Sequence, residues 1–150
     1  GRRDGSRFWV LQRFLRVLQR FVTAASRHRS PSSLRAMAGE AGQKRTVLLA
    51  TEKAFAADAV AKIETVFSEA KYEMKKLENY ASKGDLEKAI ADVDAVIIRS
   101  DIVDAAVLDA AAKLKIVVRA GAGYDNIDLK ACEAKGVCAM NTPGQNANAA

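Results

Sequence analysis

The chain has 150 residues, 28% of them charged, and a formal net charge of +6. The positive excess lies in residues 1–43, which hold nine arginines and two acidic residues, whereas the rest of the chain is nearly neutral. We therefore expect no nucleic-acid partner for the folded part. No apolar run approaches the length of a membrane span, so no membrane partner is expected for that part either.

Residues 1–43 have the composition of a leader outside the fold. Residues 8–22 place apolar side chains on one arc of a helix and arginines on the opposite arc, and residues 26–33 are rich in Ser, Arg and Pro. Such a segment is typical of an organelle transit peptide, which would direct the protein to a plastid or mitochondrion. Alternatively, translation starts at Met37 and the protein is cytoplasmic, or the helix binds a membrane surface or a partner.

From Lys44 onward, short apolar runs alternate with segments of helical spacing. The runs predict strands at 46–50, 93–98, 115–118 and 137–140, and a weaker, charged segment predicts a further strand at 72–77. The segments between them predict helices at 57–67, 83–90, 105–111 and 129–135, the last two capped by Asp104 and Asp128. This alternation predicts an α/β fold, a flavodoxin-like parallel sheet of order 2-1-3-4-5 with helices on both faces and 72–77 at an edge.

A glycine-bearing loop follows the fourth predicted strand. Gly121 and Gly123 match the start of the dinucleotide fingerprint G-x-G-x-x-G, but the third glycine position is Asn126. The acid that should bind a ribose about twenty residues on falls near Asn141. We interpret the loop as one that holds a small anion, namely a substrate carboxylate, and expect no cofactor-binding residue here.

Ligands of such sheets meet the carboxyl ends of the strands. The predicted ends offer the Arg99 guanidinium, the Ser100 hydroxyl, backbone N–H groups at 121–123 and side-chain amides at 141–146. All of them can donate hydrogen bonds, and none forms an obvious acid–base pair, so the inventory suits an anionic substrate. Each has a purely structural alternative, such as a solvated arginine or a tight turn, and their convergence at one edge favours binding.

Other chemistry finds little support in the folded part. Cys132 and Cys138 are interpreted as reduced core residues, since they form no C-x-x-C pair. The single histidine, His28, lies in the leader, which excludes a histidine-based catalytic site in the rest of this chain. We expect no metal site.

Three segments together, 96–100, 117–128 and 140–146, resemble the D-isomer-specific 2-hydroxyacid dehydrogenases. The resemblance runs from about Thr46 to the end of the chain and leaves out the leader. It implies that residues 44–146 are the N-terminal segment of a substrate-binding domain. It also implies that residues 147–150 begin the helix that joins this domain to a nucleotide-binding domain.

The resemblance also implies roles for particular residues. Arg99 and Ser100 would hold the phosphate or distal end of a small anionic substrate, and the amides around Ala122 and Gly123 would hold its carboxylate. Asn146 would lie at the crossing between the domains. The family transfers a hydride to NAD with an Arg, a Glu and a His that come later in the chain, so this chain would contain no catalytic residue and would be inactive alone.

The resemblance favours 3-phospho-D-glycerate as the substrate, at the first step of serine biosynthesis, and a homo-oligomeric parent enzyme. Two alternatives stay open. A relative on the same fold could act as a corepressor or interaction protein. A receiver-like signalling module is a weaker alternative, because Glu52, Arg99 and Asn141 stand where it would need an acidic pair, an Asp and a Lys.

Overall fold

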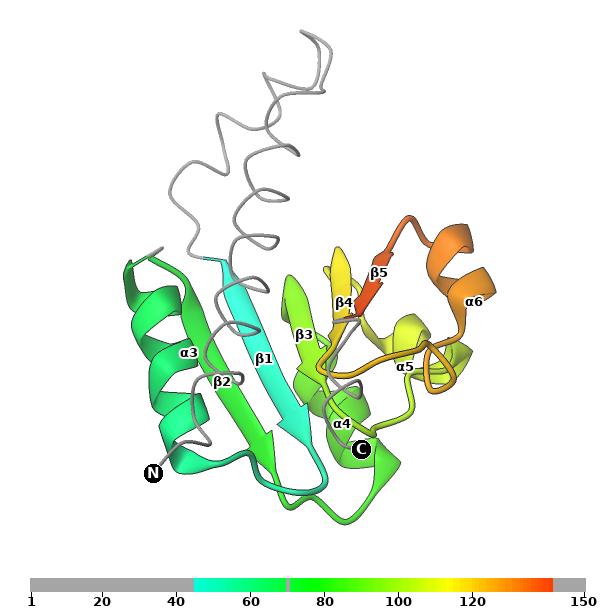
Figure 1. Ribbon diagram of the computed structural model, residues 1–150. Coiled ribbons are helices and arrows are strands. Elements are labelled where there is room, and N and C mark those ends of the chain that lie inside the picture. Colours follow the sequence, from blue (N-terminus) through cyan, green and yellow to red (C-terminus); the bar gives the residue numbers. More distant parts are fainter. Residues whose placement is uncertain (1–44, 70, 142–150) are drawn as a thin grey trace, which may run out of the picture. The chain divides into compact units, whose positions relative to one another are not determined.

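Five short strands pair as one parallel sheet in the order β2-β1-β3-β4-β5 (Figure 1). The strands are β1 (Thr46–Thr51), β2 (Glu73–Glu78), β3 (Ala95–Ile98), β4 (Ile116–Arg119) and β5 (Cys138–Asn141). The computed structural model describes residues 45–69 and 71–141. The predicted parallel sheet and its strand order are confirmed. The predictions for residues 1–43, for the side-chain amides at 142–146, Asn146 included, and for residues 147–150 lie outside the described residues.

Four helices connect the strands: α3 (Ala57–Glu69), α4 (Lys83–Ile90), α5 (Ala105–Ala110) and α6 (Leu129–Ala134). Both predicted aspartate caps are confirmed. Asp104 accepts a hydrogen bond from the Val107 N–H, and Asp128 accepts one from the Ala131 N–H. Each carboxylate satisfies an N–H that has no partner within its helix and complements the positive end of the helix dipole.

Four of the five strands begin one or two residues later than predicted, and the structure explains the shift in β2 and β3. Tyr72 was expected in β2, but its N–H donates to the Phe67 carbonyl and its ring packs edge-on against the Phe67 ring, so it completes the end of α3. Val93 was expected in β3, but the strand begins only after Asp94. The Asp94 carboxylate accepts from the Thr46 N–H at 2.9 Å, which ties the start of β3 to β1 through a side chain.

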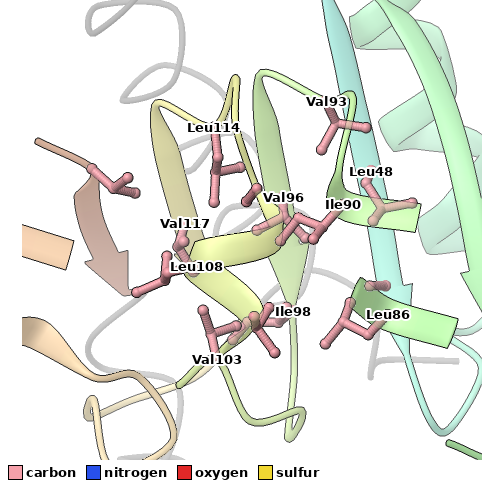
Figure 2. Close-up of a cluster of buried hydrophobic side chains, with 14 of the residues drawn as sticks. Leu48, Leu86, Ile90, Val93, Val96, Ile98, Val103, Leu108, Leu114 and Val117 are labelled. Carbon is pink, nitrogen blue, oxygen red and sulfur yellow. The ribbon is translucent and has the colours of Figure 1, made fainter. Parts of the chain in front are cut away.

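The sheet carries helices on both faces, as predicted. Leu86 and Ile90 of α4, together with residues of α5 and α6, pack against one face in a buried apolar cluster (Figure 2). Its strand members are Leu48, Ala50, Val96, Ile98 and Val117. Successive strand residues point to opposite faces, so Lys76 points away from the cluster that its neighbour Leu77 joins. Lys76 pairs with Glu64 of α3, which places α3 on the opposite face.

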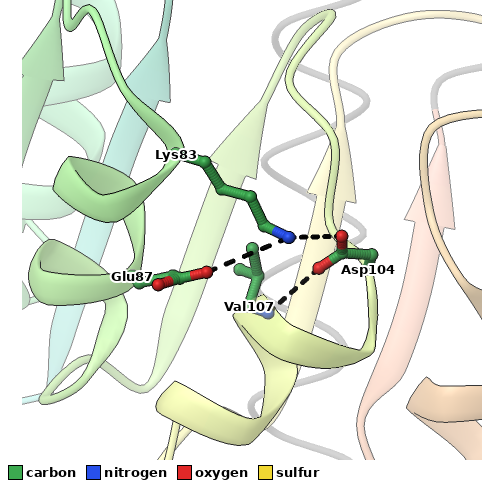
Figure 3. A network of polar contacts seen from close by, with 4 residues as sticks. All are labelled: Lys83, Glu87, Asp104 and Val107. Carbon is green, nitrogen blue, oxygen red and sulfur yellow. Dashed lines mark hydrogen bonds and ion pairs between the residues drawn. The ribbon is translucent and has the colours of Figure 1, made fainter.

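Helices α4 and α5 are joined at the surface by one lysine. The Lys83 ammonium pairs with the Asp104 carboxylate and lies 3.9 Å from the Glu87 carboxylate (Figure 3). The second oxygen of Asp104 accepts from the Val107 N–H at 3.1 Å. Asp104 therefore caps α5 and links it to α4. The hydrogen bond from Lys83, and then the one from the Val107 N–H, lower the pKa of Asp104 below its ordinary value.

We predict that Asp104→Ala lowers the free energy of unfolding by about 1 kcal/mol at neutral pH, most of it from the lost cap because the ion pair is exposed. A lowered pKa stabilises the fold above the ordinary aspartate value, about pH 4, and this contribution disappears as the pH falls through the lowered value. Urea unfolding should therefore separate the two proteins at pH 7 and no longer at strongly acidic pH. Asp109→Ala, late in the same helix and exposed, is the matched control. An equal loss in both variants would contradict the cap.

Within the described residues, no helix is long and apolar enough to cross a membrane.

Candidate functional site

The carboxyl edge of the sheet brings together the segments that follow β3 and β4 and the last residue of β5, Asn141 (Figure 1). In the strand register, Ile98 of β3 lies beside Arg119 of β4, and Arg119 lies beside Asn141 of β5. Arg99 and Ser100 follow β3 directly, and the glycine loop follows β4. Segments that lie about twenty residues apart in sequence therefore share one edge.

The Arg99 and Ser100 side chains are both exposed at this edge. The backbone of Arg99, in contrast, is held on both sides. Its N–H donates to the Asp101 carboxylate at 3.1 Å, and its carbonyl accepts long hydrogen bonds of 3.4 Å from Asn126 Nδ2 and Arg119 Nε. The structure thus presents an accessible guanidinium and hydroxyl on a fixed backbone.

The glycine loop leaves backbone N–H groups available. Gly123 has φ +84°, in the region that favours glycine, and a Cβ there would lie 3.2 Å from Arg119 Nη1. The Gly121 N–H donates to the Arg119 carbonyl at 3.0 Å. Within the described part of the chain, the N–H groups of Ala122 and Gly123 donate to no acceptor. These two donors suit an anion, as the sequence pattern indicated.

Arg119 is the residue that our sequence reasoning missed. Its side chain is 19% exposed and lies against the glycine loop, where Gly121 and Gly123 approach the guanidinium. Among the described residues its Nη1 has no hydrogen-bond partner, and the nearest carboxylate, that of Asp125, is 4.0 Å away. A buried donor without an acceptor is costly, and an anion at this edge would supply one. The sequence signal that could have identified Arg119 was a charged residue at the end of an apolar strand.

The glycine loop does not fit a dinucleotide. Asn126 stands at the third glycine position of the fingerprint. Its Nδ2 donates hydrogen bonds to the Asp101 carbonyl, at 2.7 Å, and to the Arg99 carbonyl. The next helix, α6, begins only at Leu129, and the Asp128 carboxylate occupies its N-terminus. A negative charge at that position repels the pyrophosphate that a dinucleotide-binding helix attracts.

Three other polar or nucleophilic side chains, those of Thr51, Cys132 and Cys138, have structural surroundings. Thr51 is buried, and its hydroxyl donates to the Lys53 carbonyl at 2.6 Å. Burial raises the pKa of both the Cys132 and the Cys138 thiols, which favours the thiol over the thiolate. Among residues 45–69 and 71–141, no three His, Cys, Asp or Glu side chains are placed to hold a metal ion.

Comparisons with known proteins agree with the fold. The family model described as D-isomer specific 2-hydroxyacid dehydrogenase, catalytic domain, matches residues 48–150. The crystal structure of NAD⁺-bound 3-phosphoglycerate dehydrogenase of Entamoeba histolytica is 46% identical, with a TM-score of 0.68 over 70% of this chain and 35% of that one. D-lactate dehydrogenase of Escherichia coli, with 19% identity and a TM-score of 0.55 over 65% of this chain and 30% of that one, shares the fold.

Two curated relatives match shorter stretches. D-3-phosphoglycerate dehydrogenase of Mycobacterium leprae is 51% identical over 63 residues, 41% of this chain and 12% of the relative. Hydroxypyruvate reductase of Thermotoga maritima is 40% identical over 78 residues, 51% of this chain and 26% of the relative. The aligned part is thus a small share of each relative. Because the family model matches more than half of the chain, the protein belongs to the D-isomer specific 2-hydroxyacid dehydrogenase family.

Proposed function

We propose that this chain is the substrate-binding part of an NAD-dependent dehydrogenase that oxidises 3-phospho-D-glycerate. The observation that carries the proposal is the pair of guanidinium groups, Arg99 and Arg119, at one sheet edge beside two available backbone N–H groups. Arg matches the geometry of phosphate and carboxylate with a fork of parallel donors. The names of the Entamoeba histolytica and Mycobacterium leprae relatives support this substrate.

The proposed division of labour follows from exposure and position. Arg99 and Ser100, which are exposed, would hold the phosphate. The N–H groups of Ala122 and Gly123 would hold the carboxylate, and the less exposed Arg119 would neutralise charge between the two ends. A substrate carrying two anionic groups fits this arrangement better than a simple hydroxyacid, because each end meets its own donors.

NAD accepts a hydride from the substrate carbon when it is bound, and we propose that a further domain of a longer parent protein binds it. The glycine loop described above is unsuited to a dinucleotide, and the family resemblance assigns the catalytic Arg, Glu and His to later residues. By this proposal the 150-residue chain binds the anion without oxidising it. In the longer parent protein, this oxidation would be the first step of serine biosynthesis.

Ligand-observed NMR titration of the purified chain tests this function. We expect saturable binding of 3-phospho-D-glycerate and at least roughly tenfold weaker binding of D-glycerate, which lacks the phosphate and its charge-assisted hydrogen bonds. Equal affinities for the two compounds would show that the chain does not recognise the phosphate. Fluorescence titration with NADH should show no saturable binding, and saturable binding would contradict the placement of NAD outside this chain.

The Thermotoga maritima relative favours a second candidate, a substrate such as hydroxypyruvate that carries no phosphate. The same titration with hydroxypyruvate distinguishes the two. Hydroxypyruvate binding more tightly than 3-phospho-D-glycerate would favour this candidate.

A further inference from the structure

Asp101 is a buried carboxylate directly behind the Arg99–Ser100 pair. Asp101 as a whole is 1% exposed. One carboxylate oxygen, Oδ1, accepts from the Glu52 N–H at 2.9 Å and from the Tyr80 hydroxyl. The other, Oδ2, accepts from the Arg99 N–H at 3.1 Å. Both oxygens of this buried carboxylate thus accept hydrogen bonds from neutral donors.

The three donors come from three different loops at the carboxyl edge. Glu52 follows β1, Tyr80 follows β2, and Arg99 follows β3. On the other side of the same turn, Asn126 donates to the Asp101 carbonyl at 2.7 Å. Asp101 therefore links the ends of β1 and β2 to the turn after β3 that carries Arg99.

We propose that Asp101 is a positioning residue that fixes the backbone of Arg99, so that its guanidinium is presented to the anionic group of the substrate. The inference rests on the function proposed above and extends it to a residue that does not itself touch the ligand. A fixed backbone spares the binding step the cost of ordering this turn.

The charge of Asp101 makes the proposal testable. A carboxylate close to an anion site opposes anion binding if it acts through its charge alone, so its removal would then tighten binding. If it acts by positioning, its removal weakens binding. Burial, followed by the hydrogen bond to Asp101, raises the pKa of Tyr80, so the hydroxyl remains a donor at physiological pH.

The central variant is Asp101→Asn. It replaces one carboxylate oxygen with an NH₂ group, which then faces one of the hydrogen-bond donors around Asp101. We expect its affinity for 3-phospho-D-glycerate to fall about tenfold, measured by NMR titration under conditions where the amide spectrum shows a folded protein. Amide exchange at Arg99 or at Glu52 should accelerate by at least about tenfold, because these two N–H groups donate to different oxygens of Asp101 and Asn keeps only one of them. Asp109→Asn, exposed on α5, is the matched control and should change neither quantity.

Tyr80→Phe is the second variant, because it removes one donor and leaves the carboxylate on its two backbone partners. It should weaken binding by a smaller factor, and it decides the question if Asp101→Asn does not fold. Unchanged or tighter binding in the folded variant would overturn the proposal. If the wild-type chain binds no 3-phospho-D-glycerate, the proposed function fails, and unaltered amide exchange in Asp101→Asn would then overturn the positioning role separately.

Discussion

Arg99→Ala should weaken the binding of 3-phospho-D-glycerate by roughly 10- to 150-fold, the factor that corresponds to losing charge-assisted hydrogen bonds of about 1.5–3 kcal/mol. The side chain is exposed, so the substitution removes no buried contact and the fold should persist. NMR titration of the folded variant measures the effect. In a complete parent enzyme, the apparent KM for the phosphorylated substrate should rise much more than kcat falls.

Arg45→Ala is the matched control for this prediction. Arg45 precedes β1, at the amino edge of the same sheet, so the variant loses the same charge far from the proposed site. Its affinity should stay close to that of the wild-type chain at physiological salt, where charges more than about 8 Å apart are largely screened. Equal losses in both variants would show that net charge, and not a site at the carboxyl edge, attracts the anion.

Ile90→Ala should lower the free energy of unfolding by about 2–5 kcal/mol, because it removes buried methyl groups and leaves a cavity. Ile90 is 0% exposed and lies in the cluster between α4 and the sheet (Figure 2). Each kcal/mol lowers the melting temperature of a domain of this size by roughly 4–8 °C. Urea unfolding and thermal melting followed by circular dichroism both measure the loss.

The same substitution at an exposed position is available as a control. Ile102 is 63% exposed, and Ile102→Ala should change the free energy of unfolding by less than about 0.5 kcal/mol. A loss at Ile90 no larger than the loss at Ile102 would contradict the burial of α4 against the sheet.

Most of the fold was predictable because its determinants are local. The apolar runs and helical spacing predicted the strands and helices, whose alternation indicates a parallel sheet, and Asp104 and Asp128 cap their helices through N–H groups only three residues away. The errors were also local. Tyr72 has the β propensity of an aromatic residue, but its contact with Phe67 at the end of α3 prevails.

The supports of the candidate site were not predictable in the same way. Arg99 and Ser100 follow a recognisable strand, so their edge could be predicted. Arg119 acquires its place through pairing with β3, and Asp101 through hydrogen bonds to Glu52 and Tyr80, 49 and 21 residues away in sequence. Such contacts leave no periodic trace, because they depend on which strand ends the folded sheet brings together.

The most direct test of the central claim is to map the bound substrate on the assigned amide NMR spectrum of the chain. We expect 3-phospho-D-glycerate to shift the amide signals of Arg99, Ser100, Ala122 and Gly123 along one saturable curve. Amides at the opposite edge, such as that of Lys115, should stay unchanged. Saturable shifts centred away from the carboxyl edge, or no shifts at all, would contradict it.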